Sequence, residues 1–237
     1  MNILLVDSAD FIDERMLVIR GRRFEHLKKV LRIEVGREIC TGVLNGAIGS
    51  AKVIHIDREQ CTLKILHLTQ APPPTLPLTL LLGLPRPRML QRTLQTIATM
   101  GVERLCLIQT NRVEKSFWQT PLLKPENVRE QLLIGLEQAK ATQLPTIEFH
   151  KRFRPFAEDT LPELSRETQN FIAHPGNFPQ AYTLVLQPTC LAIGPEGGFI
   201  DKEIEYFLAS GFNPIQIGER ILRVETAVPV LLAKLFN

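Results

Sequence analysis

The stretch that decides the fold is Cys190-Leu191-Ala192-Ile193-Gly194-Pro195-Glu196-Gly197-Gly198-Phe199-Ile200-Asp201. Its first four residues are an apolar run with the length and composition of a buried strand. A glycine-rich loop follows, and residues 201–210 then show helical spacing, with Asp201 expected as the N-cap. The expected inner face of that helix is Ile204, Phe207 and Leu208. A strand, a glycine loop and a helix in succession predict one βα unit.

The same alternation extends over residues 78–237. Apolar runs predict strands at 78–84, 104–109, 146–149, 171–173, 190–193 and 214–217. Helical patterns lie between them at 88–100, 125–141, 201–210 and 225–236. Strands that alternate with helices predict an α/β domain built around a mainly parallel sheet.

Residues 1–70 show a different pattern of apolar residues. Short apolar runs at 3–6, 38–41, 51–56 and 62–66 predict a small β-barrel or β-rich domain. One helix is expected within it, with Phe24, Leu27, Val30 and Leu31 on its inner face. Four prolines between Pro72 and Pro77 predict an extended connector. The expected organisation is therefore a first domain at 1–70, a linker at 71–77 and a second domain at 78–237.

Composition excludes several classes of protein. The chain has 237 residues, of which 44% are hydrophobic and 22% charged, so disorder, collagen and coiled coil are excluded. No apolar run approaches the roughly 20 residues of a membrane span, and the acidic N-terminus does not resemble a secretory signal, so a cytoplasmic location is expected. The spacing of the four cysteines fits no zinc motif. We expect buried thiols and no metal.

The net charge of +3 is small, but two segments of the chain are locally basic. Residues 20–37 hold seven Lys and Arg against two Glu, and residues 86–115 hold six against two. Two such segments favour a polyanion contacted by two surfaces. Ordinary solvated faces would explain the same charges about equally well.

Three loops that follow expected strands carry the candidate chemistry. The loop 193–199 contains three glycines, which permit close backbone approach to a ligand, but it lacks the dinucleotide and P-loop motifs. It fits either a backbone pocket for a nucleoside-like ligand or a tight turn. The loop 217–227 holds two arginines, and Arg223 with Glu225 fits either a functional pair or a weak surface ion pair. The third loop contains His174, a residue type that is more often structural than catalytic.

Together these loops carry a family resemblance. Gly194-Pro195-Glu196-Gly197-Gly198-Phe199, with the later segment from Ile217 to Ala227, is similar to the paired signature of the ribosomal small subunit methyltransferase E family, which belongs to the SPOUT methyltransferases. The segment 25–36 resembles the PUA-like RNA-binding domain of the same family. The resemblance covers nearly the whole chain.

The resemblance implies S-adenosylmethionine-dependent methylation of N3 of a uridine in 16S rRNA, within the small ribosomal subunit. It implies an N-terminal PUA-like β-barrel, a SPOUT α/β domain with a deep trefoil knot, and a homodimer. The cofactor residues that it implies are His174, Gly176, Ile193, Gly194, Pro195, Glu196, Gly197, Gly198, Ile217, Gly218, Ile221, Leu222 and Thr226.

Methylation of a uracil nitrogen requires that the negative charge on the ring be stabilised, a task suited to an arginine. Arg223 is the first candidate and Arg220 the second, and Glu225 or Glu196 would orient the arginine or accept the proton. The expected RNA contacts are Arg20, Arg22, Arg23, His26, Lys28, Lys29, Arg32, Arg86, Arg88 and Arg112.

The sequence also departs from the family pattern. Thr96 and Thr99 replace a lysine and a glutamate, and Ala141 replaces an arginine. Because the glycine loop is intact, cofactor binding is the firmer expectation and the target nucleotide the weaker one. The alternatives are an RNA-binding or ribosome-assembly protein that lacks the reaction, and a methyltransferase for another RNA base.

Overall fold

A computed structural model describes residues 1–176, 178–183 and 186–236. The chain divides into two compact units, one comprising residues 1–74 and 136–144 and the other residues 75–135 and 145–237. Within the described ranges, no helix has both the length and the apolarity needed to span a membrane.

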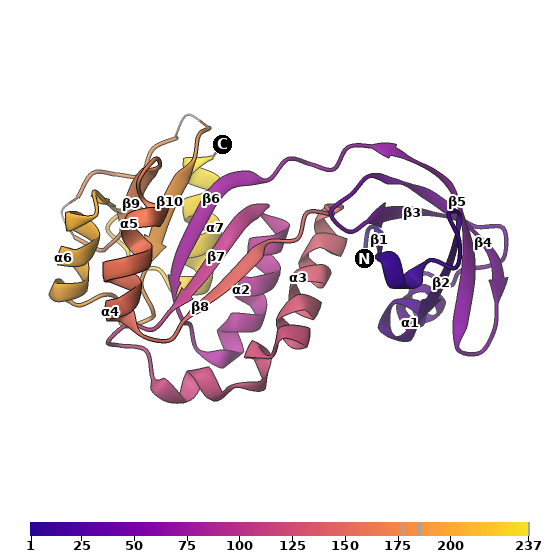
Figure 1. Ribbon diagram of the computed structural model, residues 1–237, viewed down its shortest axis with the longest axis horizontal. Helices are drawn as coiled ribbons and strands as arrows, with labels where there is room; N and C mark the ends of the chain where they lie inside the picture. Colours follow the sequence, from indigo (N-terminus) through magenta and orange to yellow (C-terminus); the bar gives the residue numbers. More distant parts are fainter. Residues whose placement is uncertain (177, 184–185, 237) are drawn as a thin grey trace. The chain divides into compact units, whose positions relative to one another are not determined.

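The first unit is a five-stranded sheet with one α-helix (Figure 1). The strand order is β1-β3-β4-β5-β2, and only the β1–β3 pair is parallel. Its elements are β1 (Leu4–Val6), the short helix η1 (Ser8–Asp10), β2 (Met16–Arg20), α1 (Gly21–Lys29), β3 (Glu38–Val43), β4 (Ile48–Ile56) and β5 (Gln60–Gln70). Three register shifts between β4 and β5 curve the sheet around its core.

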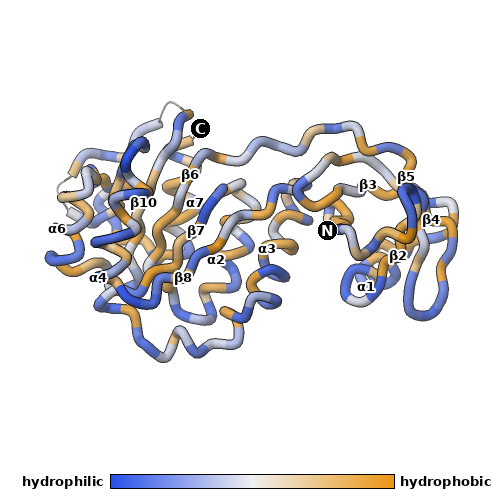
Figure 2. Tube along the Cα trace, viewed as in Figure 1, coloured by the Kyte–Doolittle hydropathy of each residue, from blue (hydrophilic) through white to orange (hydrophobic). Residues whose placement is uncertain are grey.

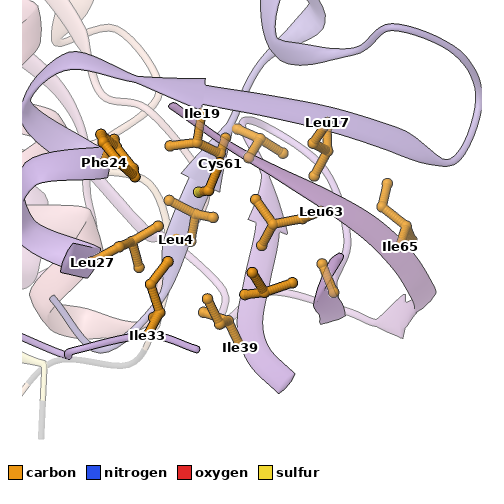
Figure 3. Packing of buried hydrophobic residues seen from close by; sticks show 13 residues of the cluster. Leu4, Leu17, Ile19, Phe24, Leu27, Ile33, Ile39, Cys61, Leu63 and Ile65 are labelled. Carbon is orange, nitrogen blue, oxygen red and sulfur yellow. The ribbon is translucent and has the colours of Figure 1, made fainter. Parts of the chain in front are cut away.

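Alternate residues of these strands form the core of the first unit (Figure 3). Leu17 and Ile19 from β2 meet Leu63 from β5, and Phe24 and Leu27 from α1 complete the cluster. Two sequence expectations were wrong. Strand β2 was not anticipated, and Val30 is 63% exposed because α1 ends at Lys29.

A segment distant in sequence belongs to the first unit. The backbone N–H groups of Asn2 and Ile3 donate to the carbonyl of Glu137, at 2.8 and 3.3 Å. Thr142 donates its hydroxyl to the carbonyl of Gly46 at 2.7 Å, within the β3–β4 turn. Residues 136–144 therefore pack with the first unit, whereas the sequence placed that unit entirely within residues 1–70.

The second unit contains a six-stranded, fully parallel sheet in the order β11-β9-β10-β6-β7-β8. Its strands are β6 (Leu76–Gly83), β7 (Val102–Ile108), β8 (Thr146–His150), β9 (Gln169–Ala173), β10 (Thr189–Ile193) and β11 (Asn213–Ile215). Its helical segments are α2 (Pro87–Thr99), η2 (Lys115–Gln119), η3 (Pro121–Leu123), α3 (Pro125–Ala139), α4 (Phe153–Pro155), η4 (Phe156–Thr160), α5 (Leu161–Leu164), α6 (Asp201–Ala209) and α7 (Val224–Leu235). The last residues of α3, from 136 onward, pack with the first unit. The α/β class with a mainly parallel sheet is confirmed.

Helices cover both faces of this sheet, as its apolar strands require. Phe156, Leu161 and Phe207 pack against Cys106 and Cys190 on one face. Helices α2 and α7 contact each other (Figure 1), and α3 approaches α2 so closely that a Cβ at Gly135 would lie 2.4 Å from the carbonyl oxygen of Gln95. The central strands β6 and β10 are largely apolar in sequence and largely buried, whereas the edge strand β8 includes polar and exposed residues; Figure 2 colours the chain by hydropathy.

The start of α6 differs from the sequence expectation. Ile200 is the N-cap and Asp201 is the first helical residue. Leu208 was expected to face inward, but it is 47% exposed, while Glu203 is buried. The burial of Glu203 was not predicted, because the spacing of apolar residues indicates only which apolar side chains face the core. It cannot identify a carboxylate that is buried because backbone N–H groups satisfy it.

Candidate functional site

The candidate site lies at the carboxyl edge of the parallel sheet, where the chain leaves two neighbouring strands in different directions. Strand β6 continues toward β7, which pairs with one of its edges, while β10 pairs with the other edge. Ligands in parallel α/β sheets bind in the crevice at such a switch point. At this switch point, residues 84–86 follow β6 and the glycine loop, residues 194–198, follows β10.

The glycine loop packs closely against the end of β6, where a Cβ at Gly83 has no room. A Cβ at Gly83 would lie 2.6 Å from both the N and the Cδ of Pro195. The N–H of Gly198 donates to the carbonyl of Pro195 at 2.8 Å, and the φ of +74° at Gly198 favours glycine at that turn. The Oε1 of Glu196 accepts a hydrogen bond from the backbone N–H of Arg86 at 3.0 Å. Glu196 therefore holds the glycine loop to the N-cap residue of α2.

Arg112, from the loop that follows β7, reaches the same place. Its Nη1 donates to the carbonyl of Gly197. A Cβ at Gly197 would lie 3.0 Å from the Cδ of Arg112, so the absence of a side chain makes room for the arginine stem. Three adjacent strands therefore send loops to one point, and Arg112, expected as an RNA contact, also supports the glycine loop.

The loops that follow β9 and β11 are joined to each other. The N–H of His174 donates to the carbonyl of Ile215 at 3.0 Å, and the N–H of Ala181 donates to that of Gln216 at 2.8 Å. Burial lowers the pKa of His174, the nearby Asp201 raises it, and Arg112 lowers it. The net effect lowers the pKa of His174, and burial is its largest cause.

The candidate catalytic residues lie at the entry to α7. Arg223 is the N-cap, and its carbonyl accepts from the N–H groups of Thr226 and Ala227 at 2.9 and 2.7 Å. The side chains of Arg220 and Arg223 are exposed, and Glu225 lies in the first helical turn. Over the described ranges, no hydrogen bond or ion pair joins Arg223 to Glu225. The alternative of a surface ion pair is therefore not present here, and the guanidinium groups are available to a ligand.

The other expected cofactor residues lie on the same loops. Ile193 is buried at the end of β10, and Gly194 and Pro195 are buried beside it. Gly176, Ile221 and Thr226 are exposed, and Ile217, Gly218 and Leu222 are partly buried. Ile221 is 82% exposed, which is high for an isoleucine.

Two of the expected RNA contacts are used inside the first unit. Arg23 donates to both carboxylate oxygens of Asp10, at 2.6 and 2.7 Å, and to the carbonyl of Leu5 at 2.8 Å. Arg22 forms a two-point ion pair with the buried Glu137, at 2.9 and 3.0 Å. Each of these arginines neutralises a carboxylate that has little access to water, a structural role that the sequence did not predict. Their contact with RNA stays a prediction.

The remaining basic residues are mostly exposed. Helix α1 is largely hydrophilic (Figure 2), and its Lys28 and Lys29 are exposed, with Lys29 paired to Glu25 at 2.6 Å. His26 is partly buried. Arg20, Arg32, Arg86 and Arg88 are also exposed.

One group of residues with possible metal-ligand atoms lies on strands β7 and β8. Cys106, Glu148 and His150 have ligand atoms within 4.8 Å of one another on β7 and β8. Glu148 is already paired with His150 at 3.3 Å and lies 3.7 Å from the Nε of Arg104. These contacts account for the cluster as an ion-pair network on one face of the sheet.

Sequence models of known families match both units. A model described as the RNA methyltransferase domain matches residues 72–236, and one described as the RNA methyltransferase PUA domain matches residues 19–66. The ribosomal RNA small subunit methyltransferase E of Treponema pallidum is 30% identical over 96% of this chain and 87% of its own. The chain belongs to the ribosomal RNA small subunit methyltransferase E family.

Two solved structures share the fold of this chain. A methyltransferase E from Neisseria gonorrhoeae, solved bound to S-adenosyl methionine, has a TM-score of 0.74, with 19% identity over 98% of this chain and 94% of its own. A methyltransferase from Legionella pneumophila, solved with the same cofactor, has a TM-score of 0.72, with 21% identity over 98% and 95% of the two chains. These likenesses establish the fold, with its PUA domain and parallel-sheet domain. The trefoil knot stays a prediction.

Proposed function

We propose that this chain methylates N3 of a uridine in 16S rRNA within the small ribosomal subunit, using S-adenosylmethionine. The observation that carries the proposal is the glycine loop, which the loops after β6 and β7 hold through Glu196 and Arg112. The exposed side chains of Arg220 and Arg223, at the entry to α7, supply the candidate charge-stabilising groups. Since ribosomal subunits lie in the cytoplasm, the activity would be cytoplasmic.

The site has the features that an adenosine-bearing cofactor requires. The close packing at Gly83 and Gly197 leaves little room for a Cβ at either position, and the backbone amides and carbonyls of the glycine loop could read an adenine edge. Thr110, at the end of β7, is 1% exposed, and its Oγ1 has no hydrogen-bond partner within the described chain. A buried hydroxyl without a partner is costly, so a bound ligand or water would satisfy it. The loops of His174 and Ile217 would complete the binding surface.

S-adenosylmethionine supplies an electrophilic methyl group on a sulfonium centre. The protein must hold the uracil so that N3 faces that methyl group and must favour loss of the N3 proton. We assign Arg223 to the negative charge that develops on the uracil oxygens, with Arg220 as the second choice. Glu225 would orient the arginine or accept the proton, and Glu196 is the alternative acceptor.

The RNA would be held by the exposed basic residues of both units. The proposed phosphate contacts are Arg20, His26, Lys28, Lys29, Arg32, Arg86, Arg88 and Arg112. Each phosphate neutralised should steepen the dependence of log K on log salt by about 0.7 to 0.9.

A homodimer is part of the proposal. Ile221 is 82% exposed and Tyr182 is 57% exposed, and both lie on the loops that follow the last strands of the sheet. Burying such side chains against a second copy would stabilise a dimer. Light scattering during gel filtration should therefore give twice the chain mass of 26.8 kDa.

The test uses labelled S-adenosylmethionine and small ribosomal subunits from a strain without the family enzyme, followed by mapping of the labelled nucleotide. Label on N3 of one uridine is expected. Arg223→Ala should lower kcat by about 100-fold or more, as expected for loss of one charge-stabilising group, with unchanged cofactor affinity. Arg166→Ala, an exposed arginine far along the chain, is the matched control. Label on a base other than uridine would show that the chain is a methyltransferase for another RNA base. Absence of S-adenosylmethionine binding in calorimetry would favour an RNA-binding protein that lacks the reaction.

A further inference from the structure

Glu203 is a buried carboxylate that the function proposed above does not use. It lies in the first turn of α6 and is 3% exposed. Burying a carboxylate costs free energy unless hydrogen bonds compensate for the lost water. Its position beside the glycine loop makes its partners informative.

The two oxygens of Glu203 bind backbone groups from two different loops. Oε1 accepts from the N–H of Asn111 at 2.6 Å, and Oε2 accepts from the N–H of Ile200 at 3.1 Å. Asn111 belongs to the loop after β7, whereas Ile200 ends the loop after β10. One side chain therefore fixes the separation of the two loops that border the candidate cofactor site.

The loop that holds Asn111 is rigid on its other side as well. Gln109 donates its amide to the carbonyls of Thr110 and Val113, at 2.6 and 2.9 Å, and accepts from the Nε1 of Trp118 at 2.6 Å. All of these contacts hold the segment between β7 and η2 in one shape. Arg112, next to Asn111, can then reach the carbonyl of Gly197.

We infer that Glu203 is a positioning residue, which holds the Asn111 loop against the start of α6 and so keeps the glycine loop in its cofactor-binding form. In this role Glu203 would act through the backbone of Asn111 and Ile200, to which its two oxygens bind, and not by contact with a ligand. This inference rests on the proposed function, since it concerns the same cofactor site. Its effect should reach the cofactor through Arg112 and Gly197 and should leave RNA binding by the first unit unchanged.

Glu203→Gln tests the inference with a side chain of the same shape. The amide oxygen can still accept one backbone N–H, but the amide nitrogen presents a second donor to the other. We expect the affinity for S-adenosylmethionine in calorimetry to fall about tenfold, equivalent to about 1.4 kcal/mol. The affinity for an rRNA fragment, measured by fluorescence anisotropy, should stay the same. Glu205→Gln, an exposed position on the same helix, is the matched control and should change neither affinity.

Hydrogen exchange supplies a second measurement, and the part made on the wild-type protein does not depend on the variant folding. In the wild-type protein, addition of S-adenosylmethionine should slow exchange at Asn111 and Ile200 together. In a folded Glu203→Gln protein, exchange should accelerate in residues 109–113 and 194–200 but not in β8. Equal cofactor affinity of Glu203→Gln and wild type, or independent protection of the two amides, would overturn the positioning role. If the wild-type protein fails to bind the cofactor, the proposed function itself is wrong.

Discussion

The ion pair between Arg22 and Glu137 gives the sharpest test of how the first unit is held together. Glu137 has a side chain only 3% exposed, and Arg22 supplies both of its guanidinium contacts at 2.9 and 3.0 Å. Arg22→Met removes the positive partner and leaves a buried carboxylate. Such a loss costs about 3 to 5 kcal/mol. Because Arg22 is itself 38% exposed, water can partly replace it, so we expect the lower end, about 3 kcal/mol.

The double variant Arg22→Met, Glu137→Met distinguishes the effect of an unpaired buried charge from the effect of changed side-chain packing. Replacing both charges by apolar side chains is often neutral, so its stability should lie within about 1 kcal/mol of wild type. Native-state hydrogen exchange of β3 and β4 is the assay, because it reports on the first unit alone. A loss of 3 kcal/mol corresponds to roughly 150-fold faster exchange in the single variant.

The same pair of variants decides whether Arg22 contacts RNA. If Glu137 occupies the guanidinium, the double variant should keep both the RNA affinity and its salt dependence. Equal destabilisation of the single and double variants would refute the buried-charge argument. A salt slope lower by about 0.7 to 0.9 in the double variant would restore Arg22 as a phosphate contact.

Three further predictions concern the second unit and the thiols. Gly83→Ala places a methyl group 2.6 Å from Pro195. Scanning calorimetry should therefore show a loss of unfolding free energy of about 1 to 3 kcal/mol, and titration calorimetry should show weaker S-adenosylmethionine binding. Unchanged stability and unchanged affinity would contradict the close contact between Gly83 and Pro195. Burial lowers the pKa of His174 below its ordinary 6.5, so the unfolded chain binds more protons, and stability should rise with pH up to about that value. Denaturation of His174→Gln at several pH values should show a smaller rise of unfolding free energy with pH than the wild type shows. The same pH dependence in both proteins would contradict the role of His174. With a thiol reagent such as DTNB at pH 8, Cys40 should react first, because it is partly exposed while burial raises the pKa of Cys61 to about 11 and that of Cys190 to about 12; mass spectrometry of the labelled peptides checks the order.

Most strands and helices could be predicted from the sequence because their signals are local. The runs 78–84 and 190–193 became β6 and β10, and the pattern over 88–100 became α2, with Pro87 at its start. Strand β2 was missed because five residues between charged neighbours carry too little periodicity. The glycine loop was found because its composition is itself the signal for close backbone packing.

Contacts between distant residues could not be predicted. Net charge in a segment does not show that Arg23 is neutralised by Asp10 or Arg22 by Glu137, which is 115 residues away. Nor does helical spacing show that Glu203 turns inward to meet Asn111.

The sequence by itself determined the α/β class, the glycine loop and the family resemblance, because hydrophobic period and motif composition are properties of neighbouring residues. Only the tertiary structure decided that residues 136–144 complete the first unit and that Glu203 joins two loops of the candidate site. The physical reason is burial: a charge removed from water must find its partner wherever the fold places one, whatever its distance along the chain.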